Sequence, residues 1–107
     1  MKLLTRTEEL ILWAVGRLES DAYCVPIRDA ISELTGEEWP LGSIYMPLDR
    51  LHKRGYLRSR LSESTPERGG RRKRVYRLTP AGVRALEQTR EVQLKMWRYG
   101  TDRVKES

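Results

Sequence analysis

The stretch of sequence that decides the fold is LGSIYMPLDRLHKRGYL, residues 41–57. Its apolar residues recur at intervals of three and four, which is the spacing of one face of an α-helix. They are Leu41, Ile44, Leu48 and Leu51. Pro40 disfavours a helical residue before it, so we expect the helix to begin at residues 41–43. Gly55 is expected to end it in the left-handed conformation.

The residues that follow predict a β-hairpin. From residue 57 the period changes to two, since arginines alternate with apolar or small residues. The alternating run is Leu57, Arg58, Ser59, Arg60 and Leu61. A second strand is expected at residues 73–78, and the polar segment STPERGGRR, residues 64–72, connects the two strands as the hairpin tip.

A short helix is predicted near the N-terminus. Thr5 and Glu8 have the spacing of a capping box, which predicts a first helix up to Leu18. Several of its apolar residues share one arc of the helix, whereas Leu12 and Trp13 project elsewhere. The residues of the arc are Leu10, Ile11, Ala14, Val15 and Leu18.

Two further helices have a proline near their starts. Pro26 fits the first turn of a second helix, which Gly36 ends. Its inner face is expected to carry Ile27, Ile31 and Leu34. Thr79 and Pro80 supply an N-cap and a first-turn proline for a fourth helix that runs to about Tyr99.

Three helices, a hairpin and a further helix, in this order, form the arrangement of a winged helix-turn-helix. We therefore predict a mainly α fold with a small β-hairpin. Residues 1–79 are expected to form the winged helix-turn-helix domain and residues 80–99 a long C-terminal helix. Residues 100–107 are expected to be a disordered tail.

The charges are distributed unevenly along the chain. The formal net charge is +6 at neutral pH, but residues 1–49 carry −5, residues 50–77 carry +9 and residues 78–107 carry +2. One segment thus carries more than the whole net charge, which is typical of a surface that binds a polyanion. A basic loop that is merely solvated is the alternative.

Length and residue usage exclude several classes of function. A chain of 107 residues fits one small domain. Cys24 and His52, each the single residue of its type, are too few for an internal disulfide or an ordinary zinc site, and they lie on different predicted helices. We therefore expect no catalysis, no metal and no cofactor. No apolar run reaches the roughly 20 residues of a membrane span, so we expect a cytoplasmic protein without membrane contact.

The basic segment and the third predicted helix together supply groups that bind double-stranded DNA. A helix N-terminus at Gly42 and Ser43 attracts phosphate, and Tyr45 is placed to hydrogen-bond or stack against the backbone. Arg50 and Lys53 lie about two turns further along, where they reach base edges or phosphates in a major groove. Basic residues of the wing suit the phosphate backbone or the minor groove. They are Arg58, Arg60, Arg68, Arg71, Arg72 and Lys73.

The two stretches at residues 41–57 and 68–82 resemble the PadR family of bacterial transcriptional regulators, and the resemblance covers about residues 4–97. The matches are Gly42, Ser43, Ile44, Tyr45, Leu48, Leu51, Gly55, Tyr76, Arg77, Leu78, Thr79 and Gly82. The segment DAYCVPI, residues 21–27, departs from the family at Ala22 and Pro26, but Tyr23 fits and is carried over as a DNA contact. The resemblance implies a dimeric winged-helix repressor, in a family that often responds to small aromatic or drug-like effectors.

The fourth helix has two apolar arcs, which independently predicts a second subunit. The polar stripe between them is Arg84, Glu87, Gln88, Glu91, Lys95 and Arg98. The arcs are Val83, Leu86, Leu94 and Trp97 on one side and Ala85, Val92, Met96 and Tyr99 on the other. Because one small domain covers only one arc, the other should meet a partner. A single wide stripe that faces the core is the alternative.

We therefore assign a homodimer interface, or a ligand cavity between subunits, to Leu12, Trp13, Val92, Met96 and Trp97. The predicted function is a sequence-specific transcriptional regulator, a repressor that binds a pseudo-palindromic operator as a homodimer. Release by a small-molecule ligand stays open. The alternative is a winged-helix interaction module that binds an acidic protein, and the salt dependence and sequence preference of DNA binding separate the two.

Overall fold

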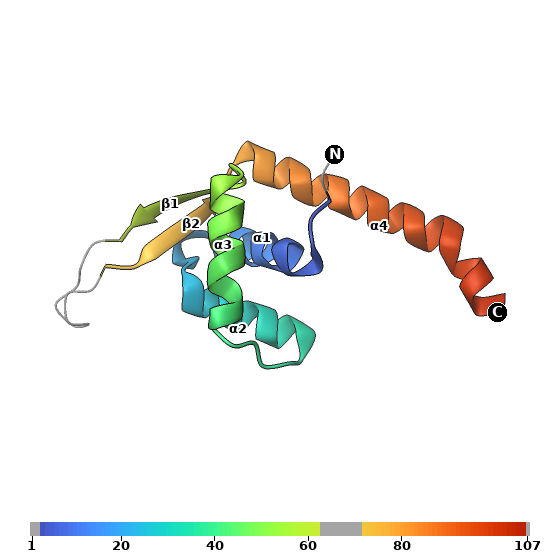
Figure 1. Ribbon diagram of the computed structural model, residues 1–107, viewed down its shortest axis with the longest axis horizontal. Helices are drawn as coiled ribbons and strands as arrows, with labels where there is room; N and C mark the ends of the chain where they lie inside the picture. The colour runs from blue at the N-terminus through green and yellow to red at the C-terminus, as the bar shows by residue number, and fades with distance from the viewer. Residues whose placement is uncertain (1–2, 63–71, 107) are drawn as a thin grey trace.

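The computed structural model describes residues 3–62 and 72–106, with side chains up to residue 100 (Figure 1). Its elements are α1 (Arg6–Leu18), the 3-10 turn η1 (Glu19–Asp21), α2 (Cys24–Thr35), α3 (Gly42–Lys53), β1 (Leu57–Leu61), β2 (Arg74–Leu78) and α4 (Pro80–Glu106). The hairpin projects from one side of the three-helix body, and α4 extends away from the other side. The predicted fold class, a mainly α winged helix with a small hairpin and a long C-terminal helix, is confirmed.

The ends of the helices follow from local sequence. Thr5 and Glu8 form both hydrogen bonds of the capping box, as their spacing predicts. Gly36 and Gly55, with φ of 73° and 81°, adopt the left-handed conformation directly after α2 and near the end of α3. The Thr79 hydroxyl accepts the Gly82 amide at 3.1 Å and caps α4.

The core forms where α1 packs against α2, α3, β2 and α4. Its central residues are Ile11, Leu12, Ala14, Val15, Ile27, Ile31, Ile44, Leu48, Leu51 and Leu57. The prediction that Leu12 points away from the core is wrong. Helix α1 is surrounded on more than one side, and Leu12 is fully buried. The expectation for Leu34 is also wrong. It lies in the last turn of α2 with 55% of its surface exposed.

The two strands pair antiparallel, with Leu57 opposite Leu78 and Ser59 opposite Tyr76. The Tyr76 amide also donates to the Ala22 carbonyl at 2.8 Å, which ties the hairpin to the turn before α2. Directly opposed residues share a face of an antiparallel pair. One face of the hairpin therefore carries Ser59, Tyr76 and Arg74, and the other carries arginines from both strands.

Helix α4 is fixed to the body at its start and extends away from it toward the C-terminus. The Thr79 amide donates to the Tyr56 carbonyl, and any side chain at Gly82 would clash with that carbonyl. The helix was expected to end near Tyr99, but it continues to Glu106. Gly100 costs only about 1 kcal/mol in a helix interior, and no proline follows it, so the helix is not stopped there. At about 1.5 Å per residue, α4 is roughly 40 Å long.

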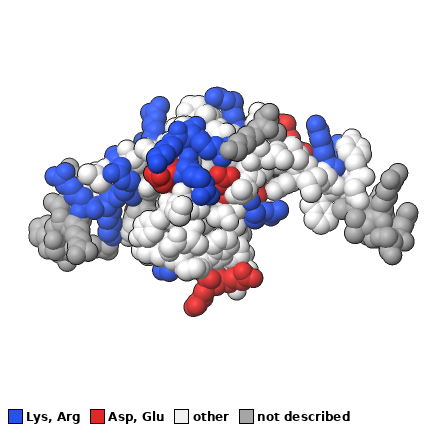
Figure 2. Space-filling view, viewed as in Figure 1, with Lys and Arg blue, Asp and Glu red and all other residues white. Residues whose placement is uncertain are grey.

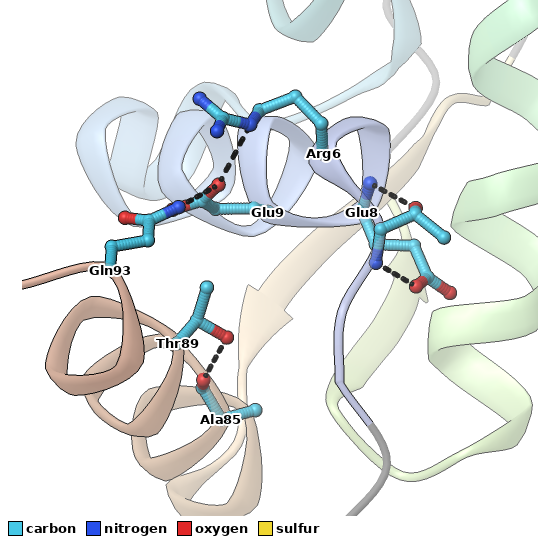
Figure 3. A network of polar contacts seen from close by, with 7 residues as sticks. Arg6, Glu8, Glu9, Ala85, Thr89 and Gln93 are labelled. Atoms are coloured by element: carbon cyan, nitrogen blue, oxygen red, sulfur yellow. Dashed lines mark hydrogen bonds and ion pairs between the residues drawn. The ribbon is translucent and has the colours of Figure 1, made fainter. Parts of the chain in front are cut away.

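Two adjacent glutamates of α1 connect it to the helices on either side. Figure 3 shows Glu8 in the capping box and the link from Glu9 to Gln93 of α4. The Glu8 carboxylate accepts a hydrogen bond from Arg54, at the end of α3, at 2.9 Å. Glu9 accepts from Gln93 of α4 at 3.0 Å and lies 3.5 Å from Arg6. Helix α1 thereby fixes both α3 and α4.

Glu8→Ala is expected to destabilise the protein by about 3 kcal/mol, because it leaves the Arg54 guanidinium without its partner in a largely buried pair. Burial alone would raise the pKa of the Glu8 carboxyl, but hydrogen bonds within the capping box and the charges of Arg54 and Arg50 lower it below its usual value. A lowered pKa contributes stability above the unfolded-state pKa, and this is lost as pH falls through the folded-state value.

Urea unfolding between pH 7 and pH 3 measures both effects. Glu9→Ala is the matched control, since it removes the neighbouring carboxylate with its part-exposed ion pair to Arg6 and its hydrogen bond from Gln93, which are together worth about 1 to 2 kcal/mol. Equal loss of stability in the two variants would contradict the assignment to the Glu8–Arg54 pair.

Within the residues that the structure describes, no helix is long and apolar enough to cross a lipid bilayer. The same residues bring together no three side chains of the kinds that hold a metal ion.

Candidate nucleic-acid interface

The outward face of α3 carries exposed side chains that suit a groove of DNA. Tyr45, Met46, Arg50 and Lys53 are all exposed. Lys53 pairs with Asp49 at 2.9 Å, one helical turn away. Exposed ion pairs of this kind contribute little, so Lys53 can exchange Asp49 for a phosphate at small cost.

The N-terminus of α3 offers fewer free donors than the sequence suggests. The Ser43 amide and hydroxyl both donate to the Pro40 carbonyl, at 3.0 and 2.6 Å, and the Ile44 amide donates to the Leu41 carbonyl. Gly42 is exposed and its missing side chain leaves open space. A phosphate at this end can therefore approach Gly42 closely, while the Ser43 hydrogens are already engaged.

Tyr23 and Tyr45 lie around the start of α2, where the hairpin joins the helices. The Lys73 ammonium sits 4.0 Å from the centre of the Tyr23 ring, a cation–π contact. Burial raises the pKa of the Cys24 thiol, and the neighbouring Tyr45 and Arg28 oppose this rise. These contacts link α2, α3 and the first basic residue before β2.

One serine joins the hairpin to α3. The Ser59 hydroxyl accepts a hydrogen bond from Arg74 at 2.9 Å and lies 3.3 Å from His52 Nε2. Burial raises the pKa of the neighbouring Tyr76 hydroxyl, and the positive charge of Arg74 opposes this. Ser59, His52 and Arg74 thus hold this face of the hairpin beside α3.

Sequence reasoning missed this group. The alternation of residues 57–61 separates Ser59 from its arginine neighbours, but the partner strand is needed to bring Arg74 to the same face. The opposite face of the hairpin carries Arg58, Arg60 and Arg77. Arg60 and Arg77 lie next to the end of α1. Arg58 and Arg60 are thus on the face away from α3, and their predicted contact with the phosphate backbone or the minor groove stays a prediction.

Basic side chains follow the hairpin and the last turns of α3, and acidic ones gather below the end of α2 (Figure 2). Arg72 is exposed and Lys73 is half-buried against Tyr23. The predicted contacts Arg68 and Arg71 lie outside the described residues. Within the described part, Arg50 and Lys53 of α3 and Lys73 and Arg74 of the hairpin form the basic surface on this side, and Arg72 directly precedes Lys73.

Comparison with protein families decides what kind of protein carries this surface. The profile of the transcriptional regulator PadR-like family matches residues 11–88. The chain belongs to the PadR-like family. It is accordingly a DNA-binding regulator of transcription, and regulators of this family are in general not enzymes.

Solved structures agree with the fold of a PadR-like regulator. A PadR family regulator of Clostridium difficile is 25% identical, with 95% of this chain and 97% of that chain covered and a TM-score of 0.63. The complex structure of hsRosR-S1 is 29% identical, with 96% and 84% covered and a TM-score of 0.66. A PadR-like factor of Bacteroides fragilis, 24% identical, gives a TM-score of 0.73 over 91% and 87%. No curated protein matches the chain.

The predicted interface or cavity residues of this PadR-like protein separate into three groups. Leu12 is fully buried in the core of one chain. Trp13 lines a shallow hollow between α1 and α2 with Leu34 and lies under Arg17. Val92, Met96 and Trp97 line a different hollow of about 420 Å³, between α4, α1 and residues 3–4. Within one chain, Trp13 and Trp97 therefore do not share a cavity.

Proposed function

We propose that this PadR-like protein is a homodimeric transcriptional repressor that reads a pseudo-palindromic operator with α3 and the hairpin. The observation that carries the proposal is the continuity of the basic surface. Arg50 and Lys53 of α3 and Lys73 and Arg74 of the hairpin lie on adjacent elements that Ser59 and Tyr23 hold together. A duplex that receives α3 in its major groove then meets the hairpin at the neighbouring backbone or minor groove.

The side chains of α3 have distinct roles in this proposal. Arg50 is suited to read a guanine edge, because a guanidinium binds O6 and N7 together. Met46, 71% exposed on the same face, is suited to contact a thymine methyl. Tyr23, Tyr45, Gly42 and Ser43 are proposed to contact the phosphate backbone, which fixes the register without reading sequence.

The dimer is supported by the apolar surface of α4. Leu94, Met96, Trp97 and Tyr99 expose 52 to 73% of their surface on a helix that extends beyond the body. Such a surface is unusual for a monomer and typical of an interface. The hollow beside Val92, Met96 and Trp97 is the proposed place for a small aromatic or drug-like effector that releases the operator.

The test is selection of bound fragments from a random duplex pool, followed by footprinting of the selected site. We expect a pseudo-palindrome whose half-sites lie about 10 bp or a multiple of this apart. Arg50→Ala should cost about 1 to 3 kcal/mol on the selected site and relax the preference at one position of each half-site. Arg84→Gln, at an exposed position of α4, serves as a control that should bind as tightly as the parent.

An asymmetric footprint over a single half-site would contradict the symmetric dimer. Binding without any sequence preference would favour the alternative, a winged-helix module for an acidic protein partner.

A further inference from the structure

The hairpin face that is turned away from Ser59 carries three arginines with no assigned role. Arg58 lies directly opposite Arg77, and Arg60 lies on the same face beside Val75. Like charges directly opposite each other destabilise an antiparallel pair. Among the residues that the structure describes, none of the three arginines forms an ion pair. An arrangement that costs stability and has no counter-charge among the described residues points to a ligand.

Two of these arginines line a hollow. It has a volume of about 410 Å³ and lies between the hairpin and the end of α1. Arg60 and Arg77 line it together with Glu19 and Ser20, and its apolar wall includes Val15 and Leu78. Pockets for small molecules start at about 300 Å³ and combine an apolar wall with a few polar groups, as this hollow does.

Glu19 adds a second observation at the same place. Its φ of 52° and ψ of −111° make it the only non-glycine residue with positive φ in the described part of the chain. A glycine would adopt this conformation without strain, and strained side-chain-bearing residues cluster at functional sites. The strained residue thus places a carboxylate in the lining of the hollow that Arg60 and Arg77 also line.

We propose that this hollow binds a small zwitterion, an α-amino acid with an apolar side chain being the simplest class. A carboxylate between Arg60 and Arg77 receives charge-assisted hydrogen bonds, for which guanidinium groups are well suited. An ammonium group meets Glu19, and the apolar body rests against Val15 and Leu78. A simple anion would leave the Glu19 carboxylate unpaired, and a simple amine would face two uncompensated guanidinium groups.

The site is separate from the DNA surface and from the hollow beside Trp97. Arg60 and Arg77 are on the hairpin face opposite Ser59 and Arg74, Leu78 is the last residue of β2, and the other residues named belong to α1 and η1. The proposal therefore does not rest on the operator, the dimer or an effector at α4.

The experiment is a two-dimensional ¹H–¹⁵N NMR titration of the full chain with three probes that share one apolar body. L-Phenylalanine carries both charges, 3-phenylpropionate lacks the ammonium, and 2-phenylethylamine lacks the carboxylate. We expect saturable shifts of the Gly16, Ser20 and Val75 amides with phenylalanine, at millimolar concentrations. The other two probes should bind about tenfold more weakly, since each loses one charge-assisted contact.

Variants assign the two charged contacts. Arg60→Gln should weaken phenylalanine and phenylpropionate about tenfold, and Glu19→Gln should weaken phenylalanine but strengthen phenylpropionate. Arg58→Gln, on the same face but outside the lining, is the matched control and should change neither. The proposal is overturned if phenylalanine causes no saturable shift at these amides, or if phenylpropionate binds as tightly as phenylalanine. Loss of binding in all three variants alike would show a non-specific charge effect and would overturn it as well.

Discussion

Replacing both Met96 and Trp97 with glutamate is expected to convert the protein from a dimer into a monomer. These side chains are 64% and 70% exposed on the distal half of α4, so the substitutions disturb no packing in the core of one chain. In the proposed dimer they are covered by the partner, and each glutamate would then be a buried charge without a counter-ion. Such a charge costs several kcal/mol, which is enough to separate two small subunits.

Light scattering at micromolar concentration measures the change directly. A control with the same change in charge is Arg84→Gln with Gln88→Glu, on the polar stripe of α4, which should remain a dimer. Truncation before Gly100 should also leave the dimer intact. A parent protein that is monomeric at micromolar concentration would remove the basis of the symmetric operator.

The affinity for the operator is expected to depend on whether the protein is a dimer. A dimer brings its second α3 to the second half-site at a high effective concentration, and this gain is lost in a monomer. Operator affinity of the Met96/Trp97 variant should therefore fall about 100-fold. Its affinity for non-specific DNA should fall much less, because each α3 and hairpin is unchanged.

The parts of the fold that sequence predicts correctly depend on neighbours in the chain. The capping box of Thr5 and Glu8 and the left-handed Gly55 each involve a few consecutive residues, and both are found as expected. The burial of Leu12 depends instead on how many elements pack around α1. The exposure of Leu34 depends on where along α2 its contact with the rest of the body ends. Helical periodicity gives the angle of a side chain, but it does not tell how many neighbours surround the helix.

The functional surface shows the same division. The strand pattern of residues 57–61 predicts that two faces of the hairpin differ, and the register confirms it. Two contacts of Ser59 determine which face lies beside α3. One is with His52 of α3, and the other is with Arg74 of the partner strand. Basic residues that form one group in the sequence are therefore two groups in space, one beside α3 and one beside α1.

This division leads to a second large effect, on the salt dependence of DNA binding. Each phosphate that the protein neutralises steepens the plot of log affinity against log salt by about 0.9. Arg72, Lys73 and Arg74 are the basic residues of the hairpin that lie on or near the face beside α3. Replacing all three with alanine is therefore expected to flatten the slope by roughly 2 to 3.

Fluorescence anisotropy with one operator duplex over a range of salt concentrations measures the slope. The triple replacement of Arg84, Arg90 and Lys95 on α4 removes the same charge from exposed positions outside the proposed DNA surface, so its slope should stay within about 0.5 of the parent. Light scattering should find both triple variants dimeric, because none of the replaced residues is apolar. An unchanged slope in the hairpin variant would mean that the hairpin does not touch the duplex. The basic residues beside α3 would then be better explained as a docking surface for an acidic protein, and DNA recognition would rest on α3 alone.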